Sequence, residues 1–293
     1  MPTMTPPLLR VTASWFSEGR RMVRWSPPSR RLLAHLQPRL AVSLAPALHG
    51  RCAHLKGHGG VKGALRYLQR ALPRARYVAR FDVAAYYNSI RHDRMLGLLG
   101  QAPVSPEQLA LVGQYLALPD TRGTGRGLVA SGSLSPLLGA LYLAPLDRAM
   151  WARWRRGQLV AYVRYMDDVV LLAATRWQLR RAIAQLQQIL TGLGLRTHSE
   201  KLFIGPVTRG FDFLGYRLHP RRRLRASRES IRRLRERARR LYEREGDLCR
   251  LRQYVERWYR WLLGGLGRMV SRGGGLRRLE INILRWLGIG SRA

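Results

Sequence analysis

Two adjacent aspartates, Asp167 and Asp168, interrupt an apolar and β-rich stretch of the chain, YVRYMDDVVLLAA. The two halves of this stretch predict a β-hairpin whose tip carries both carboxylates. A third aspartate, Asp82, ends a strand-like segment over 77–83 (YVARFDV). Burying a carboxylate on an apolar strand is unfavourable unless a positive charge lies close to it. We therefore expect a cationic partner at these strand ends.

A divalent cation would cancel the repulsion between the two neighbouring aspartates. Mg²⁺ prefers oxygen ligands, usually one or two carboxylates together with substrate phosphates and water. Such sites catalyse phosphoryl and nucleotidyl transfer with two ions about 3.5–4 Å apart. The alternative for an isolated Asp-Asp pair is a turn whose side chains are simply solvated.

The charge balance makes the placement of these acids informative and points to a polyanionic partner. The chain of 293 residues has 53 Lys and Arg against 17 Asp and Glu, a formal net charge of +36. Nucleic acid is the expected partner, and an anionic membrane is the second candidate. Hydrophobic residues at 46% and aromatic residues at 9% exclude a disordered basic tail.

Membrane-spanning, secreted and disulfide-bonded architectures are not expected. No run of about 18 apolar residues appears, so we expect no spanning helix and no membrane partner. The first residues lack the pattern of a secretory signal. The two cysteines, Cys52 and Cys249, form neither a metal motif nor a disulfide scaffold. These features favour a cytoplasmic location.

Strand and helix patterns alternate in the middle of the chain, and helices alone follow. The Pro-rich residues 1–30 predict an irregular lead-in, and 31–48 is helical with interruptions at Pro38 and Pro46. One long helix is predicted to begin at Ser135-Pro136. The other predicted elements are helices over 61–72, 106–118 and 176–194, short strands over 195–205 and 211–218, and basic helices from 227 onward. The fold class is therefore α+β with a helical appendix.

Six segments, in the family's order, resemble the motifs of reverse transcriptases. FDVAAYYNSI resembles motif A, RGLVASGSLSPLLGALYL motif B, YVRYMDDVVLL motif C, GLRTHSEKLFI motif D and FDFLGYRL the primer-grip motif E. Upstream, AHLKGHGGVKGAL resembles the fingers loop of group II intron enzymes. The chain is most similar to bacterial reverse transcriptases of the group II intron-like, diversity-generating and defence-associated kinds.

The resemblance implies a right-hand polymerase fold. Its fingers and palm would combine an antiparallel sheet with helices, and a helical thumb would follow. On this basis 1–80 is expected to hold an N-terminal extension and the fingers. The palm would occupy 81–218, with a fingers insertion at about 97–125, and the basic thumb 219–293.

The resemblance also assigns the catalytic residues. Asp82, Asp167 and Asp168 match the metal-binding triad, and the main-chain carbonyl of Val83 matches the usual fourth ligand. The expected cofactor is a pair of Mg²⁺ ions, for which Mn²⁺ can substitute. Asp168 is expected to bind most peripherally. Lys201 matches the lysine that protonates the leaving pyrophosphate, a task that arginine performs poorly; the alternative is a solvated surface lysine.

Lysine occurs at only three positions, so the other two are also candidate ligands. Lys56 matches the fingers residue that holds the incoming triphosphate, and Lys62 is a weaker candidate for the same role. Tyr87 matches the aromatic steric gate that excludes a 2′-hydroxyl, with a core aromatic as the alternative. Its neighbour Tyr86 is expected to lie in the core.

Motif B departs from the family pattern. Its substrate-binding stretch corresponds here to Ala130, Ser131 and Gly132, and Ala130 stands where the family usually has glutamine. Because alanine has no side-chain hydrogen-bonding group, we expect reduced fidelity or an unusual use of the template.

The remaining matches concern primer and duplex binding. The primer grip would be formed by Phe213, Leu214, Gly215 and Tyr216. Nucleic acid would contact basic and aromatic side chains of the thumb, namely Arg232, Arg235, Arg239, Arg257, Trp258 and Arg260. The alternative is a helical bundle whose basic face has no specific partner.

The resulting hypothesis is an RNA-directed DNA polymerase that binds an RNA template, a DNA primer or product, and dNTPs. A stand-alone enzyme working with a dedicated structured non-coding RNA is favoured, and an accessory protein or a second copy are further candidate partners. Among mobility, diversification and antiviral defence, defence is preferred. The alternatives are a catalytically silent maturase-like RNA-binding protein and an untemplated or protein-primed DNA polymerase.

Overall fold

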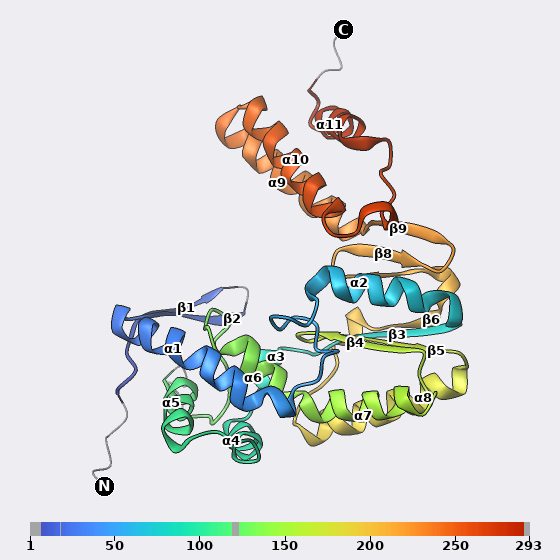
Figure 1. The fold of residues 1–293 in the computed structure, drawn as a ribbon. Coiled ribbons are helices and arrows are strands. Elements are labelled where there is room, and N and C mark those ends of the chain that lie inside the picture. The colour runs from blue at the N-terminus through green and yellow to red at the C-terminus, as the bar shows by residue number, and fades with distance from the viewer. Residues whose placement is uncertain (1–6, 18, 119–122, 290–293) are drawn as a thin grey trace. The chain divides into compact units, whose positions relative to one another are not determined.

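The computed structural model describes residues 7–17, 19–118 and 123–289, and Figure 1 shows its ribbon. The side chains of Lys201 and Glu245 also lie outside this description. The chain forms two compact units, one made of 1–64 with 77–204 and the other of 65–76 with 205–293. Each unit is described separately below.

The described strands belong to three sheets with the orders β1-β2, β4-β5-β3-β6 and β7-β8-β9. They are β1 (Val11–Ser17), β2 (Arg20–Trp25), β3 (Tyr77–Asp82), β4 (Ala161–Tyr165), β5 (Asp168–Ala173), β6 (Phe203–Pro206), β7 (Phe211–Phe213), β8 (Tyr216–His219) and β9 (Arg222–Ala226).

The described helices lie between and after these strands. They are α1 (Pro27–Leu44), α2 (Gly60–Ala71), α3 (Tyr86–Ser89), α4 (His92–Gly100), α5 (Pro106–Ala117), α6 (Ser135–Tyr142), α7 (Ala144–Arg155), α8 (Arg176–Gly192), α9 (Arg228–Glu245), α10 (Leu248–Leu263) and α11 (Gly275–Trp286). None of them is both long and apolar enough to cross a bilayer.

The central sheet of the first unit is built around a buried hairpin. β5 lies between β4 and β3 and pairs antiparallel with both, and β3 pairs with it from Tyr77 opposite Ala173 to Asp82 opposite Asp168. The strand side chains from Val169 to Ala173 are almost fully buried, because α7 and α8 pack against this sheet (Figure 1). The predicted hairpin and the α+β class are confirmed.

The second unit combines a small antiparallel sheet with a helical bundle. α9, α10 and α11 pack around a core of Leu234, Ala238, Leu251, Val255 and Ile283. Gly246 ends α9 in the left-handed conformation, and the Asp247 side chain then accepts the first N–H groups of α10. The predicted basic helices are therefore confirmed.

Three details differ from the sequence-based expectations. β1 and β2 pair antiparallel within the predicted irregular lead-in, because the prolines flank two segments that can pair. α1 continues through Pro38, since burial of its leucine face outweighs one lost backbone hydrogen bond. The predicted long helix breaks at Leu143, because Pro145 in the first turn of α7 cannot continue α6.

Candidate catalytic site

A cavity of about 310 Å³ lies in the first unit, where β3 ends and the β4–β5 hairpin turns. It is lined by Gly19, Arg20, Asp82, Val83, Ala85, Tyr86, Tyr87, Asn88, Met166, Asp167 and His198. Two of the three predicted metal-binding aspartates therefore face one space, and the residue predicted to add a main-chain ligand is beside them.

Strand register brings the aspartates to the same edge of the sheet. Asp82 is the register partner of Asp168, and the Val83 N–H donates to the Asp167 carbonyl over 3.3 Å. Because Tyr165 pairs with Asp168, the hairpin loop is only two residues long, Met166 and Asp167. Positions separated by more than 80 residues in the chain thus become neighbours.

The third carboxylate lies outside the cavity lining. Asp168 forms an ion pair with Arg80, whose Nη2 is 3.2 Å from Oδ1, and its side chain is 22% exposed. In the part of the chain that is described, no group of three or more His, Cys, Asp or Glu side chains is arranged as a metal ligand set. The protein therefore offers two carboxylates to the cavity and keeps the third at its margin.

The electrostatics of the cavity favour a proton or a cation at Asp167. Burial is the main reason why the pKa of Asp167 is raised to about 6, and its own backbone amide opposes that rise. The carboxylates of Asp82 and Asp168 raise it further, whereas Arg20 lowers it. A hard cation would offset this repulsion, and Mg²⁺ needs only one or two protein carboxylates when phosphates and water complete its shell. The donor set fits such an ion.

Two neighbouring tyrosines have different environments. Tyr86 is 5% exposed and donates to the Gly139 carbonyl, which places it in the core. Tyr87 also lines the cavity, and its buried Oη has no hydrogen-bond partner among the residues described. The same is true of the His198 Nδ1. Buried polar atoms of this kind at a cavity are typical of a site that binds a polar ligand.

The motif B residues contact the N-terminal hairpin. The Ala130 N–H donates to the Arg21 carbonyl over 2.8 Å. The Ser131 Oγ accepts from the Val23 N–H at 3.1 Å and donates to the Val23 carbonyl at 3.2 Å. This segment therefore acts as a support for β2.

Gly132 has a steric role. A Cβ at this position would lie 1.5 Å from the Oη of Tyr115, which is itself fully buried. Only glycine fits here, because the tyrosine is held by a hydrogen bond with Ser135 at 2.7 Å.

The hairpin supplies a cavity residue that the sequence did not reveal. Gly19 and Arg20 line the cavity, and the Asn88 Nδ2 donates to the Gly19 carbonyl over 2.8 Å. Arg20 is the cation that opposes the rise in the Asp167 pKa. No local pattern distinguishes it from the many other arginines, so only the tertiary structure identifies it.

The predicted lysines are not among the residues that line the cavity. Lys56 is exposed in the loop before α2. Lys62 is partly buried in α2, and this burial lowers its pKa to about 8. Lys201 is the last residue of a 3-10 helix (Ser199–Lys201), and its side chain lies outside the described part of the chain.

The predicted primer-grip residues lie in the second unit. Leu214 and Gly215 form the turn between β7 and β8, with φ of 48° and 84°. Phe213 is buried, and the Tyr216 Oη donates to the Leu262 carbonyl over 2.9 Å. A Cβ on Gly215 would approach the Trp261 ring to 3.0 Å. This turn is therefore packed onto α10.

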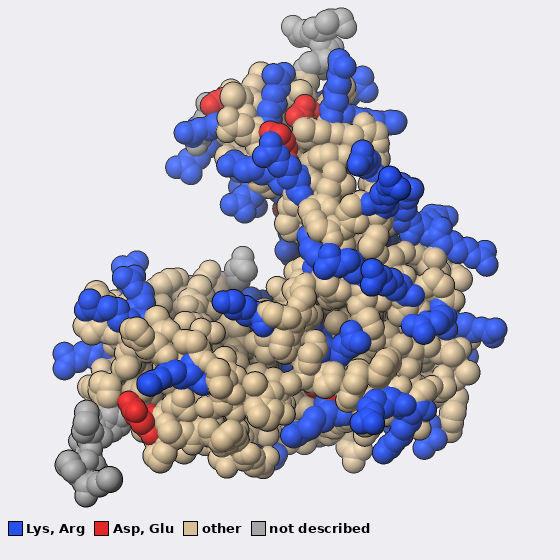
Figure 2. Space-filling model, in the orientation of Figure 1, with Lys and Arg blue, Asp and Glu red and all other residues tan. Residues whose placement is uncertain are grey.

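The predicted thumb residues differ in what they contact. Figure 2 shows Lys and Arg side chains crowding the helices of the second unit. Arg232 pairs with Glu229 and Glu236, and Arg260 pairs with Glu256. The guanidinium carbons of Arg235 and Arg239 lie 5.8 and 6.0 Å from the Trp286 ring centroid.

The remaining two predicted thumb residues, Arg257 and Trp258, lie on α10, as Arg260 does. Arg257 is exposed, whereas Trp258 packs partly against the bundle core.

The sequence did not predict a buried ion pair next to the two-residue turn Met166-Asp167, called the aspartate turn below. Arg164 and Asp147 are both fully buried, and Arg164 donates to Asp147 through Nη2 at 2.5 Å and through Nε at 2.9 Å. Tyr162 donates to the same carboxylate, and the Arg164 Nη1 donates to the Met166 carbonyl over 2.8 Å. The available signal was an aspartate in the apolar segment LYLAPLDRAM of an acid-poor chain.

One curated relative has a detectable sequence similarity to this chain. Protein YkfC of Escherichia coli (strain K12) is 24% identical over 180 residues, which are 50% of this chain and 47% of that protein. The chain thus spans about half the length of this relative.

Solved structures show the same fold. An apo telomerase from Candida tropicalis aligns with 95% of this chain and 60% of its own, at 12% identity and a TM-score of 0.54. A telomerase from Candida albicans, in complex with a fragment of telomeric RNA, aligns with 88% of this chain and 48% of its own, at 13% identity and a TM-score of 0.51.

The family model that matches is described as reverse transcriptase (RNA-dependent DNA polymerase), and it covers residues 29–218. This range includes β3, motif B and the β4–β5 hairpin that carries Asp167 and Asp168. The expected reverse transcriptase-like fold is confirmed. Because the match extends over more than half of the sequence, this chain belongs to the reverse transcriptase family.

Proposed function

We propose that this protein is an RNA-directed DNA polymerase that adds deoxynucleotides to a primer. In this reaction the primer 3′ oxygen bonds to the α-phosphorus of the dNTP, the bond to pyrophosphate breaks, and the hydroxyl proton is released. The observation that carries the proposal is the convergence of Asp82 and Asp167 on one cavity, beside Tyr87 and Arg20. Membership of the reverse transcriptase family supports it.

Reverse transcriptase domains use divalent metal ions, and we propose two Mg²⁺ ions here, with Mn²⁺ as a substitute. Asp82, Asp167 and the main chain of Val83 would hold them, with Asp168 at the margin. Such ions polarise phosphoryl oxygens and lower the pKa of an attacking hydroxyl.

The other cavity residues would bind and orient the substrates. Tyr87 would lie against the sugar and exclude a 2′-hydroxyl, and Arg20 would face the phosphates. Lys201 remains the proposed proton donor to pyrophosphate, and Lys56 and Lys62 the proposed contacts of the triphosphate. We also propose that the fingers end near residue 80, that the palm ends near residue 218 and that the thumb follows.

The partner is proposed to be a dedicated structured RNA. The net charge of +36 and the arginine-rich helices α9 and α10 suit a phosphate backbone. Antiviral defence is the proposed biological role. Plating phage on cells that express the wild type or Asp167→Asn tests that role, and equal plaque counts would contradict it.

Primer extension with Mg²⁺ and dNTPs tests the activity. We expect incorporation by the wild type and about a 100-fold or greater loss in Asp82→Asn and Asp167→Asn, because each removes charge at the proposed metal site. Retained RNA binding without incorporation on any template would instead indicate a silent RNA-binding protein.

Sequencing the product tests whether the synthesis is templated. Product that is independent of co-purified RNA would indicate untemplated or protein-primed synthesis, the alternative that Ala130 keeps open. An Ala130→Gln variant with unchanged misincorporation and product sequence would show that this departure has no effect on template use.

A further inference from the structure

The aspartate turn has a strained backbone. Met166 has a φ of 55°, a left-handed conformation that is unfavourable for a residue other than glycine and persists only where the surrounding structure holds it. This residue immediately precedes Asp167, so its conformation sets the direction in which the Asp167 carboxylate leaves the turn. The contacts that hold Met166 therefore determine the geometry of the cavity.

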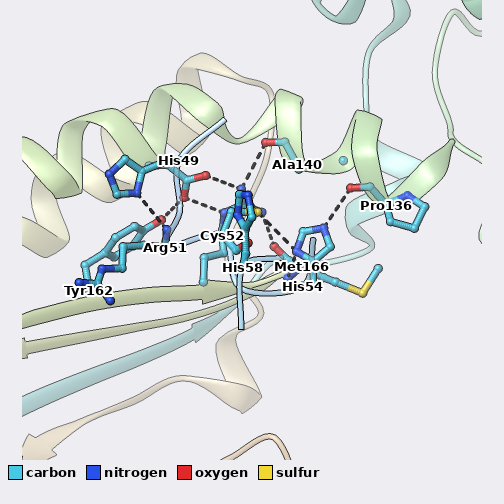
Figure 3. A network of polar contacts seen from close by, with 12 residues as sticks. His49, Arg51, Cys52, His54, His58, Pro136, Ala140, Tyr162 and Met166 are labelled. Carbon is cyan, nitrogen blue, oxygen red and sulfur yellow. Dashed lines mark hydrogen bonds and ion pairs between the residues drawn. The ribbon is translucent and has the colours of Figure 1, made fainter. Parts of the chain in front are cut away.

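Both backbone groups of Met166 form hydrogen bonds with side chains outside the turn, and Figure 3 shows Met166 beside one of these partners, His54. Its N–H donates to the Nδ1 of His54 over 3.0 Å, and its carbonyl accepts from the Arg164 Nη1 over 2.8 Å. His54 comes from the loop before α2. That loop is attached to β4, because the Ala53 N–H donates to the Arg164 carbonyl at 2.8 Å.

The partners of His54 define its protonation state. A backbone N–H can only donate, so Nδ1 accepts from Met166; a carbonyl can only accept, so Nε2 donates to Pro136 at 3.0 Å. The ring is therefore neutral and protonated on Nε2. Burial lowers its pKa to about 4, which agrees with this geometry. The Cys52 Sγ lies 3.5 Å from Nδ1, and the Tyr165 ring packs edge-on against the imidazole at a centroid distance of 5.9 Å.

We propose that His54 is a positioning residue of the polymerase: by accepting the Met166 N–H, it holds the turn so that Asp167 faces the metal cavity. This inference rests on the proposed function. His54 thereby links the loop that also contains Lys56 directly to the turn that carries Asp167.

A matched pair of variants separates the two hydrogen bonds of the ring. In His54→Asn the amide oxygen takes the place of Nδ1 and can still accept from Met166. In His54→Gln the longer amide reaches the place of Nε2 and can donate to Pro136, but it leaves the Met166 N–H unpaired. We expect kcat to fall about 10- to 100-fold in His54→Gln and about threefold or less in His54→Asn, with the KM for dNTP nearly unchanged in both.

Mn²⁺ binding, followed by electron paramagnetic resonance without nucleotide, provides a readout apart from activity. His54→Gln should bind Mn²⁺ about tenfold more weakly than His54→Asn, because a displaced Asp167 is a poorer ligand. His35→Gln, at an exposed position on α1, is the control and should match the wild type. Equal kcat and equal Mn²⁺ affinity in the Asn and Gln variants would overturn the inference.

The tautomer can be checked in the wild type, so the test survives if a variant does not fold. Nitrogen-15 NMR at pH 7 should show His54 protonated on Nε2 alone. An imidazolium, or a ring protonated on Nδ1, would contradict the proposal. A wild type that does not incorporate dNTP would reject the proposed function, and the tautomer and Mn²⁺ results would still decide the role of His54.

Discussion

At the scale of single residues, the Asp167 side chain loses its proton less readily in the cavity than in water, mainly because it is buried. Its folded pKa of about 6 lies above the ordinary value of 3.8, so the folded state binds the extra proton between these two values. The contribution of this group to the free energy of unfolding is therefore fully present below about pH 3.8. It is lost as the pH rises through about 6.

The Asp167→Asn variant should keep its stability as the pH rises, because asparagine has no ionisable group. At pH 7 without divalent ions, we expect the variant to exceed the wild type in free energy of unfolding by on the order of 2–3 kcal/mol. Below pH 4 the difference should disappear. Urea unfolding across this pH range measures it, with the exposed Glu107→Gln as control. A difference that does not change with pH would contradict the assignment.

Arg20 is expected to act on the substrate phosphates. If the protein polymerises dNTPs, Arg20→Ala should raise the KM for dNTP about 3- to 10-fold, which corresponds to the loss of one exposed charge-assisted contact. Steady-state kinetics should show little change in kcat. Arg24→Ala removes an exposed arginine from the same strand outside the cavity lining and should leave KM unchanged. Equal effects of both variants would indicate only a general charge effect.

The cavity residues differ in how far the sequence could predict them. Asp82 and Asp167 were predictable because acids are rare in this chain and carboxylates at apolar strand ends need a partner. Arg20 was not, because it reaches the cavity from a strand more than 60 residues before Asp82. Nor was His54, which contacts the cavity residue Met166 across 112 residues of sequence. Glycine at 132 was visible, but its reason, the Oη of Tyr115, depends on packing.

At the scale of secondary-structure elements, the Arg164–Asp147 pair joins α7 to β4 behind the aspartate turn. Asp147→Leu should destabilise the fold by about 3–5 kcal/mol, because it leaves a buried guanidinium without its carboxylate. Chemical denaturation measures this loss. The double variant Asp147→Leu with Arg164→Met should recover much of it, since no buried charge remains. A double variant as unstable as the single one would mean that packing, not charge, dominates here.

The elements themselves were largely predictable from periodicity and capping. α5 and α8 begin at the predicted residues 106 and 176, and the structure adds a capping box to each, at Ser105 and Thr175. The β1–β2 hairpin was not predicted, because its strands are mostly exposed and show little alternation of apolar residues. It pairs with motif B through the Ser131 side chain, a contact that local propensity does not encode.

At the scale of the whole molecule, the charge of +36 should make RNA binding strongly dependent on salt. Each phosphate neutralised contributes about 0.7–0.9 to the slope of log K against log salt. Replacing Arg235 and Arg239, which lie against Trp286, should lower that slope by about 1–2. Filter binding at several salt concentrations measures the slope. The same substitution of Arg30 and Arg31, exposed on α1, is the comparison, and an equal decrease would mean that the charge acts without a defined surface.

The path of the chain through its two units has a practical consequence for engineering. The second unit contains 65–76, where Gln69 donates to the carbonyls of His219 and Arg222 and Arg66 donates to the Gly265 carbonyl. Cutting the gene after residue 204 would therefore leave these side-chain donors without their acceptors. An exchange of C-terminal halves between relatives would have to include this short segment too, because the second unit is not continuous in the sequence.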